Sequence, residues 1–84
     1  MPCVATIFEK DGYRVMVYTR NEHPPPHVHV VRAGANIAIC ISLSGAEYRD
    51  ASGRDPTNRE IRRAVQIVKE RLQDCLFAWN KYHA

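Results

Sequence analysis

The chain contains no long hydrophobic run, and this shortage excludes a helical membrane protein. No apolar segment approaches the ~20 residues that a helix needs to cross a bilayer. The first residues also lack the charged and apolar regions of a secretory signal peptide. The excess of positive over negative charge is also small, with a net charge of only +3. This value permits an anionic partner without requiring one. We therefore expect a cytoplasmic, soluble protein with no membrane partner.

Cysteine is also in short supply, with three residues in a chain of 84. Cys3, Cys40 and Cys75 are far apart, each lies within an apolar pattern, and no two of them form a Cys-x-x-Cys unit. An odd number of widely spaced cysteines is not the pattern of a disulfide framework. The sequence predicts buried free thiols, as is usual for cytosolic proteins.

Length and composition predict one small globular domain, residues 1–84. The hydrophobic fraction is 45% and the charged fraction is 25%, which are values typical of folded proteins and not of disordered ones. A chain of this size builds a single core and has little stability to spare.

Alternating apolar residues predict four β-strands in the first half of the chain. Residues 4–8 and Tyr13–Tyr18 flank the pair Asp11-Gly12, which is typical of a hairpin turn. Residues 27–31 form the third strand. Residues 36–43 alternate most regularly, with large residues on the inner face and small ones on the outer face. The inner face of this fourth strand carries Ile37, Ile39, Ile41 and Leu43.

The C-terminal part of the chain has the pattern of one long amphipathic helix. Residues 44–56 contain glycine, aspartate and proline, and they predict an irregular connection. Thr57 and Glu60 have the spacing of a capping box, in which each side chain bonds the other residue's backbone amide. Apolar residues then recur at helical spacing, at Ile61, Ala64, Val65, Val68, Leu72, Cys75, Leu76, Trp79 and Tyr82.

These elements predict an α+β fold (ββββα): a four-stranded antiparallel sheet with one long C-terminal helix packed on one face. The apolar stripe of the helix must cover the sheet face that carries the valines and isoleucines. The opposite face is neither strongly charged nor strongly apolar. We expect it to be solvated, or to contact a second copy or another protein. Its side chains are Arg14, Met16, Tyr18, His27, His29, Ala38, Cys40 and Ser42.

Three of the four histidines lie in one short segment, residues 21–30. His23 is separated from the other two by three consecutive prolines, which restrict the backbone to extended conformations. The strand that follows puts His27 and His29 on one face and two valines on the other. Two neighbouring imidazoles and a third on a stiff arm indicate a binding or catalytic site.

This segment has an Asn-x-His-x-Pro-Pro-His-x-His-Val pattern, formed by Asn21, His23, Pro25, Pro26, His27, His29 and Val30. With the turn at Gly34 and the closing residues 76–80, the pattern resembles a family of small prokaryotic proteins, domain of unknown function 4160. The likeness spans nearly the whole chain. It implies membership of a two-gene, toxin–antitoxin-like module. Some relatives carry an acidic residue in the strand after the motif, where this chain has Cys40, Ile41 and Ser42.

Metal binding is the first hypothesis for the histidines. Neutral imidazole is the commonest zinc ligand, and two imidazoles on the same face of a strand can reach one ion. His23, His27 and His29 would supply three ligands and leave water in the fourth position. The alternative is that His23 bonds the loop backbone while the other two form a solvated strand face.

Acid–base catalysis on RNA is the second hypothesis. Two histidines close together can act as general base and general acid near neutral pH. His27 and His29 are then the candidate catalytic residues. The cations that bind the phosphate would come from the arginines flanking the motif, Arg14, Arg20 and Arg32.

A separate basic patch lies at the start of the predicted helix. Arg59, Arg62 and Arg63 are on the side away from its apolar stripe. Cations in this position oppose the helix dipole, and like charges four residues apart repel, each at a cost of a few tenths of a kcal/mol. A solvated face and a contact with phosphate or an acidic partner are the two alternatives.

The sequence therefore predicts a small cytosolic protein of a toxin–antitoxin-like module that binds a partner protein or RNA through His23, His27 and His29. A zinc-binding module and a metal-independent ribonuclease are the alternatives. Whether the protein is an enzyme stays open. The expected partner is the product of a neighbouring gene or a second copy of the chain.

Overall fold

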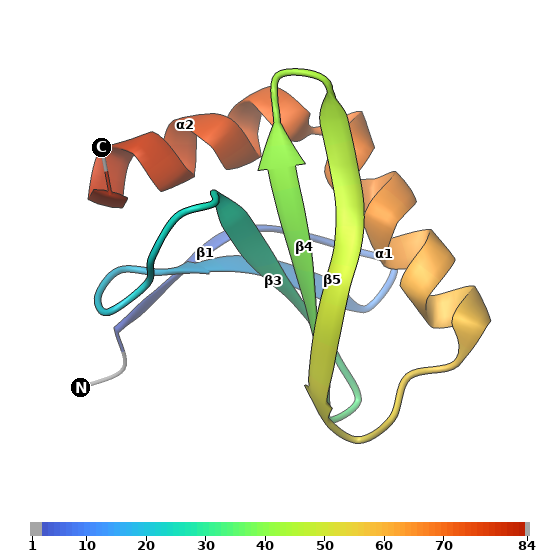
Figure 1. Cartoon of the computed structure of the whole chain (residues 1–84). Helices are drawn as coiled ribbons and strands as arrows, with labels where there is room; N and C mark the ends of the chain where they lie inside the picture. Colours follow the sequence, from blue (N-terminus) through green and yellow to red (C-terminus); the bar gives the residue numbers. More distant parts are fainter. Residues whose placement is uncertain (1–2, 84) are drawn as a thin grey trace.

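The computed structural model describes residues 3–83, which form a five-stranded antiparallel sheet and two C-terminal helices (Figure 1). Each strand pairs with the next along the chain, so the sheet order is β1-β2-β3-β4-β5. The α+β class is confirmed, whereas the predictions of four strands and a single helix were wrong. No described helix is long and apolar enough to cross a membrane. The elements are β1 (Val4–Lys10), β2 (Tyr13–Tyr18), β3 (His27–Arg32), β4 (Ala35–Ser42), β5 (Gly45–Gly53), α1 (Asn58–Glu70) and α2 (Leu72–His83).

The fifth strand occupies the segment that was predicted to be an irregular connection. β5 pairs with β4 along its whole length, with Arg49 as the extra residue of a bulge. Because β5 is an edge strand, most of its side chains are exposed. Tyr48 is its one large hydrophobic residue. Charged side chains on an edge strand prevent it from pairing with other chains. They also remove the apolar alternation by which a strand is recognised in a sequence.

The predicted single helix is interrupted at Arg71. This residue has φ −129° and ψ 42°, and its amide donates to the Val68 carbonyl at 3.1 Å. Figure 1 shows the chain changing direction there. The two helices cover different parts of the sheet, because α1 packs on β4 and β5 whereas α2 crosses β1 to β4. Neighbouring strands rotate relative to one another, so a straight helix could not follow both parts.

The core lies between the helices and one face of the sheet. Val15 pairs with Val30, and Val30 pairs with Ile37; all three side chains are fully buried. The predicted helical stripe is confirmed from Ile61 to Trp79, but Tyr82, which was placed in it, is 38% exposed, and the fully buried Ile67 was missed. Leu43 was also wrongly placed inside: it is 88% exposed, just after β4. From the helices the core receives Ala64, Ile67, Val68, Cys75 and Trp79, with Ile61, Val65, Leu72 and Leu76 half-buried beside them.

The cysteines differ in burial. Cys40 and Cys75 are free thiols, as predicted. The predicted burial is confirmed for Cys75 but was wrong for Cys3 and Cys40, which are half-buried. Burial raises the pKa of the Cys75 thiol to about 12. A protonated, buried thiol is chemically inert, so Cys75 is a core residue.

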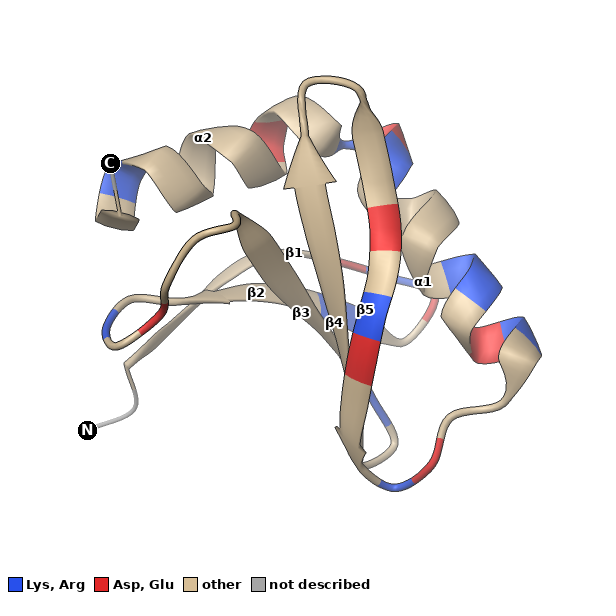
Figure 2. Ribbon diagram, viewed as in Figure 1, with Lys and Arg blue, Asp and Glu red and all other residues tan. Residues whose placement is uncertain are grey.

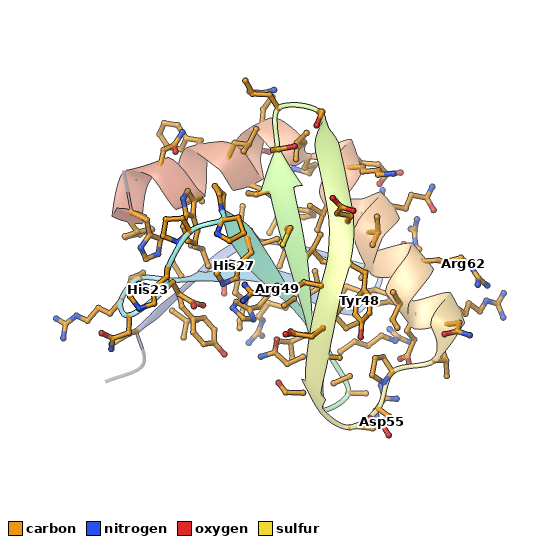
Figure 3. The ribbon with its side chains drawn as sticks, viewed as in Figure 1. His23, His27, Tyr48, Arg49, Asp55 and Arg62 are labelled. Carbon is orange, nitrogen blue, oxygen red and sulfur yellow. The ribbon has the colours of Figure 1, made fainter. Side chains whose placement is uncertain are left out.

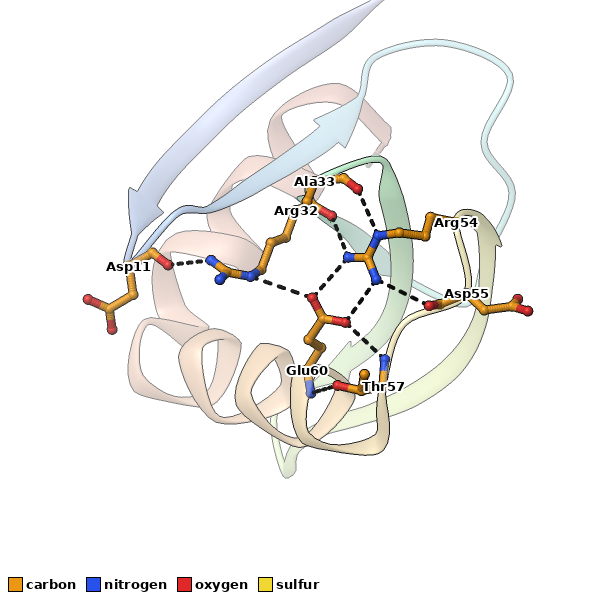
Figure 4. A network of polar contacts seen from close by, with 7 residues as sticks. All are labelled: Asp11, Arg32, Ala33, Arg54, Asp55, Thr57 and Glu60. Atoms are coloured by element: carbon orange, nitrogen blue, oxygen red, sulfur yellow. Dashed lines mark hydrogen bonds and ion pairs between the residues drawn. The ribbon is translucent and has the colours of Figure 1, made fainter.

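A polar network fixes the start of α1 against the β3–β4 turn (Figure 4). The predicted capping box is present: the Glu60 amide donates to Thr57 Oγ1 at 3.1 Å, and the Thr57 amide donates to Glu60 Oε1 at 2.9 Å. The Arg54 guanidinium donates to Glu60 Oε2 at 2.9 Å and to the carbonyls of Ala33 and Arg32 at 2.8 and 3.2 Å. The hydrogen bonds from Arg54 and from the Thr57 amide lower the pKa of Glu60 to about 2.

Candidate metal site

Glu22, His27 and His29 converge at the end of the sheet that lies near α2. Figure 3 shows His27 at the start of β3, beneath α2. His27 and His29 come from the start of β3, and their ring centroids are 5.3 Å apart. Glu22 comes from the loop between β2 and β3. Its carboxylate oxygens lie 3.2 Å from His27 Nε2 and 2.8 Å from His29 Nε2. The three ligand atoms all lie within 4.8 Å of one another.

The pleat of β3 accounts for the position of the two imidazoles. His27 pairs with Cys40 and His29 pairs with Ala38, whereas Val28 pairs with Ile39 in the core. Successive side chains of a strand point to opposite faces. The prediction that the two histidines share one face, opposite the valines, is therefore confirmed.

The loop before β3 brings Glu22 over the two rings. Asn21 adopts φ 61°, in the left-handed region that asparagine tolerates better than most residues. Farther along, the loop bends at Pro24 and Pro25, which are joined by a cis peptide bond, and it is not the straight arm that the prolines predicted. His23 is exposed on this loop and lies outside the converging group.

Glu22, His27 and His29 are called the triad below. In both histidines of the triad, the Nδ1 atom bonds an oxygen from a residue outside it. His27 Nδ1 donates to the Pro25 carbonyl at 2.9 Å, and His29 Nδ1 donates to Asn36 Oδ1 at 3.0 Å. The Asn36 amide nitrogen in turn donates to the Tyr18 hydroxyl at 3.2 Å, and the Tyr18 ring stacks on His29. A carbonyl oxygen can only accept. Each Nδ1 atom therefore carries a hydrogen, as the hydrogen-bond network assigns it.

This assignment decides what the Nε2 atoms present to Glu22. In a neutral imidazole with a hydrogen on Nδ1, Nε2 carries a lone pair, and here both lone pairs would face carboxylate oxygens. The repulsion is removed by positive charge between the three groups, either as protons on the Nε2 atoms or as a metal cation. Metal-binding histidines commonly donate their other ring N–H to a carbonyl or carboxyl oxygen, as both rings do here.

The electrostatics of the site favour an ionised Glu22. Burial raises the pKa of its carboxyl group, but the hydrogen bond to His29 and the charges of His27 and His29 outweigh burial, so the pKa is lowered overall. The carboxylate is the form that binds metal. The side chains of His27, His29 and Glu22 are 4%, 15% and 18% exposed, so the site is largely enclosed and opens to solvent beside His29 and Glu22.

A comparison with known protein families found one match. The family model described as domain of unknown function (DUF4160) matches residues 12–80. The chain belongs to the DUF4160 family. No curated protein and no solved structure matched the chain. The three converging residues of this DUF4160 protein all lie within the matched range.

The last turns of α2 pack against the histidine site of the DUF4160 protein. The Trp79 ring lies 5.1 Å from the His27 ring and 4.2 Å from the His83 ring. His83 Nε2 donates to the Tyr18 carbonyl at 2.6 Å. The expectation that Trp79 anchors the helix to the sheet is confirmed, because its side chain is buried and contacts both the core and β3. His83 is a second anchor that the sequence did not indicate.

Two of the three arginines that were expected to assist the histidines, Arg14 and Arg32, lie elsewhere. Arg14 is exposed on β2 and lies 3.7 Å from Glu9. Arg32, at the opposite end of β3 from His27, donates to the Asp11 carbonyl at 2.9 Å. The residues that do support the histidines were not singled out from the sequence. Glu22 lies inside the motif and was the one available signal, whereas Asn36 and Tyr18 become neighbours only through strand pairing.

Proposed function

We propose that the protein binds a divalent transition-metal ion, with zinc as the first candidate, through Glu22, His27 and His29. The observation that carries this proposal is the direction of the ring nitrogens. Both Nδ1 atoms donate outward to oxygens, and both Nε2 atoms face one carboxylate. Two imidazoles and a carboxylate form a donor set that zinc accepts in hydrolytic enzymes and iron(II) accepts in oxygenases.

The separations of the donor atoms fit a small cation. Ligands at about 2.0–2.1 Å from a tetrahedral zinc lie about 3.3 Å from one another. The carboxylate oxygens of Glu22 are 3.2 and 2.8 Å from the two Nε2 atoms. The three ligand atoms lie within 4.8 Å of one another, so the widest separation would have to close by no more than about 1.5 Å for all three groups to bond one ion.

Three protein ligands leave at least one coordination position open. A zinc ion with three protein ligands supplies Lewis acidity or an activated water. The protein's own part is to hold the two rings still: the Pro25 carbonyl orients His27, and Asn36 together with Tyr18 orients His29. The opening beside His29 and Glu22 is where a substrate or a partner's side chain would enter.

A metal-independent histidine pair acting on RNA has less support. General acid–base catalysis needs a ring nitrogen within hydrogen-bonding reach of the substrate. Here both Nε2 atoms are engaged by Glu22, and both Nδ1 atoms by Pro25 and Asn36. The toxin–antitoxin-like role, with a partner protein or RNA, stays a prediction from the resemblance.

The decisive experiment measures metal content and affinity together. We expect the purified protein to bind about one zinc ion, with affinity that falls as the pH is lowered, because protons compete with the metal for its ligands. Glu22→Gln and His29→Ala should each abolish or greatly weaken binding, because each removes one of three ligands. Elemental analysis and calorimetric titration would report both quantities.

His23→Ala is the matched control, because it removes a histidine of the same motif that lies outside the triad. It should bind zinc as the wild type does. Loss of zinc in His23→Ala, or retention of full affinity in Glu22→Gln, would reject the proposed ligand set.

A further inference from the structure

A second site candidate lies on α1, at the opposite end of β3 from the histidines. A hollow of about 650 Å³ opens to solvent beside the first turns of α1, and its lining includes four guanidinium groups. Figure 2 shows the basic segments along this part of α1, interrupted by one acidic segment. The arginines are Arg32 from β3 and Arg59, Arg62 and Arg63 from α1.

Two of these arginines are already paired. Arg63 forms an ion pair with the Asp11 carboxylate. Arg32 lies 3.5 Å from Glu60 Oε2, and its guanidinium stacks over the Tyr13 ring at 4.8 Å. Glu60 is also bound by Arg54 and by the helix cap, as Figure 4 shows. Glu60, which lines the hollow, and Asp11 are therefore each paired with arginine.

The other two arginines, Arg59 and Arg62, are exposed and form no ion pair or side-chain hydrogen bond with any residue from 3 to 83. The position of Arg59 is unfavourable for the helix, because a cation in the first turn opposes the dipole. Arg62 lies three residues after Arg59, on the same side of the helix. Arg59 also has the cation Arg63 one helical turn away, and like charges at this spacing repel. No described residue compensates these two positive charges. A bound anion would compensate them.

We propose that this hollow binds the phosphate backbone of a single-stranded nucleic acid. Guanidinium groups bind phosphate oxygens in pairs, with charge-assisted hydrogen bonds. The hollow is larger than one phosphate and open to solvent, so a strand can continue past it on both sides. The one aromatic ring in its wall, Tyr13, is buried beneath Arg32 and offers bases no stacking platform. The site would therefore recognise the charge of the phosphates and not the base sequence.

The test compares two double variants that each remove two exposed cations. Arg59→Gln with Arg62→Gln changes the hollow, whereas Arg49→Gln with Lys81→Gln changes exposed residues that do not line it. Glutamine is a good helix former, so the fold should persist. Binding of short single-stranded RNA and DNA oligonucleotides would be measured by fluorescence anisotropy over a range of salt concentrations.

We expect the hollow variant to bind all sequences more weakly, and about equally so. Its slope of log K against log salt should be smaller by about 1.4, at about 0.7 per lost contact with a single strand. An oligonucleotide with uncharged methylphosphonate linkages should not bind the wild type. The melting temperature of the hollow variant should equal or exceed that of the wild type, because unfavourable charges are removed.

Four outcomes would overturn the proposal: no binding by the wild type, equal weakening in the control variant, equal binding of the uncharged strand, or a lowered melting temperature in the hollow variant. The last would mean that Arg59 and Arg62 stabilise the fold. None of the readouts depends on the metal site, so the two proposals succeed or fail separately.

Discussion

The pKa is lowered for three glutamates, Glu22, Glu60 and Glu70. The partners of the first two give them different tasks. For Glu22, burial alone would raise the pKa, and contacts with His29 and His27 reverse that effect. For Glu60, hydrogen bonds from Arg54 and the Thr57 amide lower the pKa to about 2. The partners of Glu22 are imidazoles that can bind metal. The partners of Glu60 are a guanidinium and a backbone amide, which bind no metal, so Glu60 stabilises the start of α1.

The ionisation of Glu60 predicts how stability depends on pH. The folded-state pKa of about 2 lies below the ordinary value of 4.5. The charge of Glu60 therefore contributes its full stabilisation above about pH 4.5, and the contribution is lost as the pH falls to about 2. Glu60→Gln keeps a side chain that can complete the capping box but loses the charge that binds Arg54.

We expect Glu60→Gln to melt at a lower temperature than the wild type at pH 7, with a modest gap because the network is solvent-accessible. The gap should close as both proteins are melted at successively lower pH. Glu47→Gln, which removes an exposed carboxylate on β5, should show little gap. A gap for Glu60→Gln that is unchanged between pH 7 and pH 2 would contradict the assignment.

At the scale of elements, α2 joins the core to the histidine site. The buried face of α2 carries Cys75 and Trp79, and its last turn contacts His27 and the end of β2 through Trp79 and His83. The break at Arg71 allows α2 to lie across β1 to β4 while α1 covers the β5 side. The helix therefore positions the start of β3, on which the histidines lie.

Truncation of Trp79 tests this role. The side chain is 4% exposed, and removing a buried large aromatic side chain typically costs about 3–5 kcal/mol of unfolding free energy. We expect Trp79→Ala to lose stability in this range, measured by urea denaturation in the presence of a chelator so that bound metal does not contribute.

Phe77→Ala is the matched control on the same helix. Phe77 is 72% exposed, and substitutions on the surface usually change stability by no more than about 0.5 kcal/mol. Equal losses in the two variants would mean that α2 does not dock through Trp79.

The whole molecule is a small domain with one core, so binding at one end should raise the stability of the entire fold. The three ligands lie close together in the sequence, between residues 22 and 29, but the bond to Asn36 and the stack on Tyr18 that orient His29 exist only in the folded state. α2 packs on the same strand. A metal that binds only the folded state stabilises it by about 2.7 kcal/mol at a free concentration of 100 times Kd.

For a domain of this size, 1 kcal/mol corresponds to a shift of roughly 4–8 °C in melting temperature. Excess zinc should therefore raise the melting temperature of the wild type by on the order of 10 to 20 °C, and a chelator should reverse the shift. Glu22→Gln should show little change, whereas His23→Ala should respond like the wild type. Equal shifts in Glu22→Gln and the wild type would indicate that zinc binds elsewhere.

Local features of the sequence were sufficient to predict much of this structure. The alternation of Val28 and Val30 with His27 and His29 determined which side of β3 is buried, because side chains of a strand alternate between faces. The spacing of Thr57 and Glu60 determined where α1 begins, because a capping box satisfies amides that the helix leaves free. The regular run of isoleucines in β4 was enough to identify its inner face, since Ile37, Ile39 and Ile41 are all buried.

Only the tertiary structure decided the features that depend on distant neighbours. β5 exists because β4 offers it a partner, and its polar side chains carry no strand pattern of their own. The break at Arg71 lies where the helices pass from the β5 side of the sheet to β1–β4, and no proline or glycine marks it in the sequence. In the same way, the third member of the histidine site is Glu22 and not His23, because the loop bends and only folding places a carboxylate against two imidazoles.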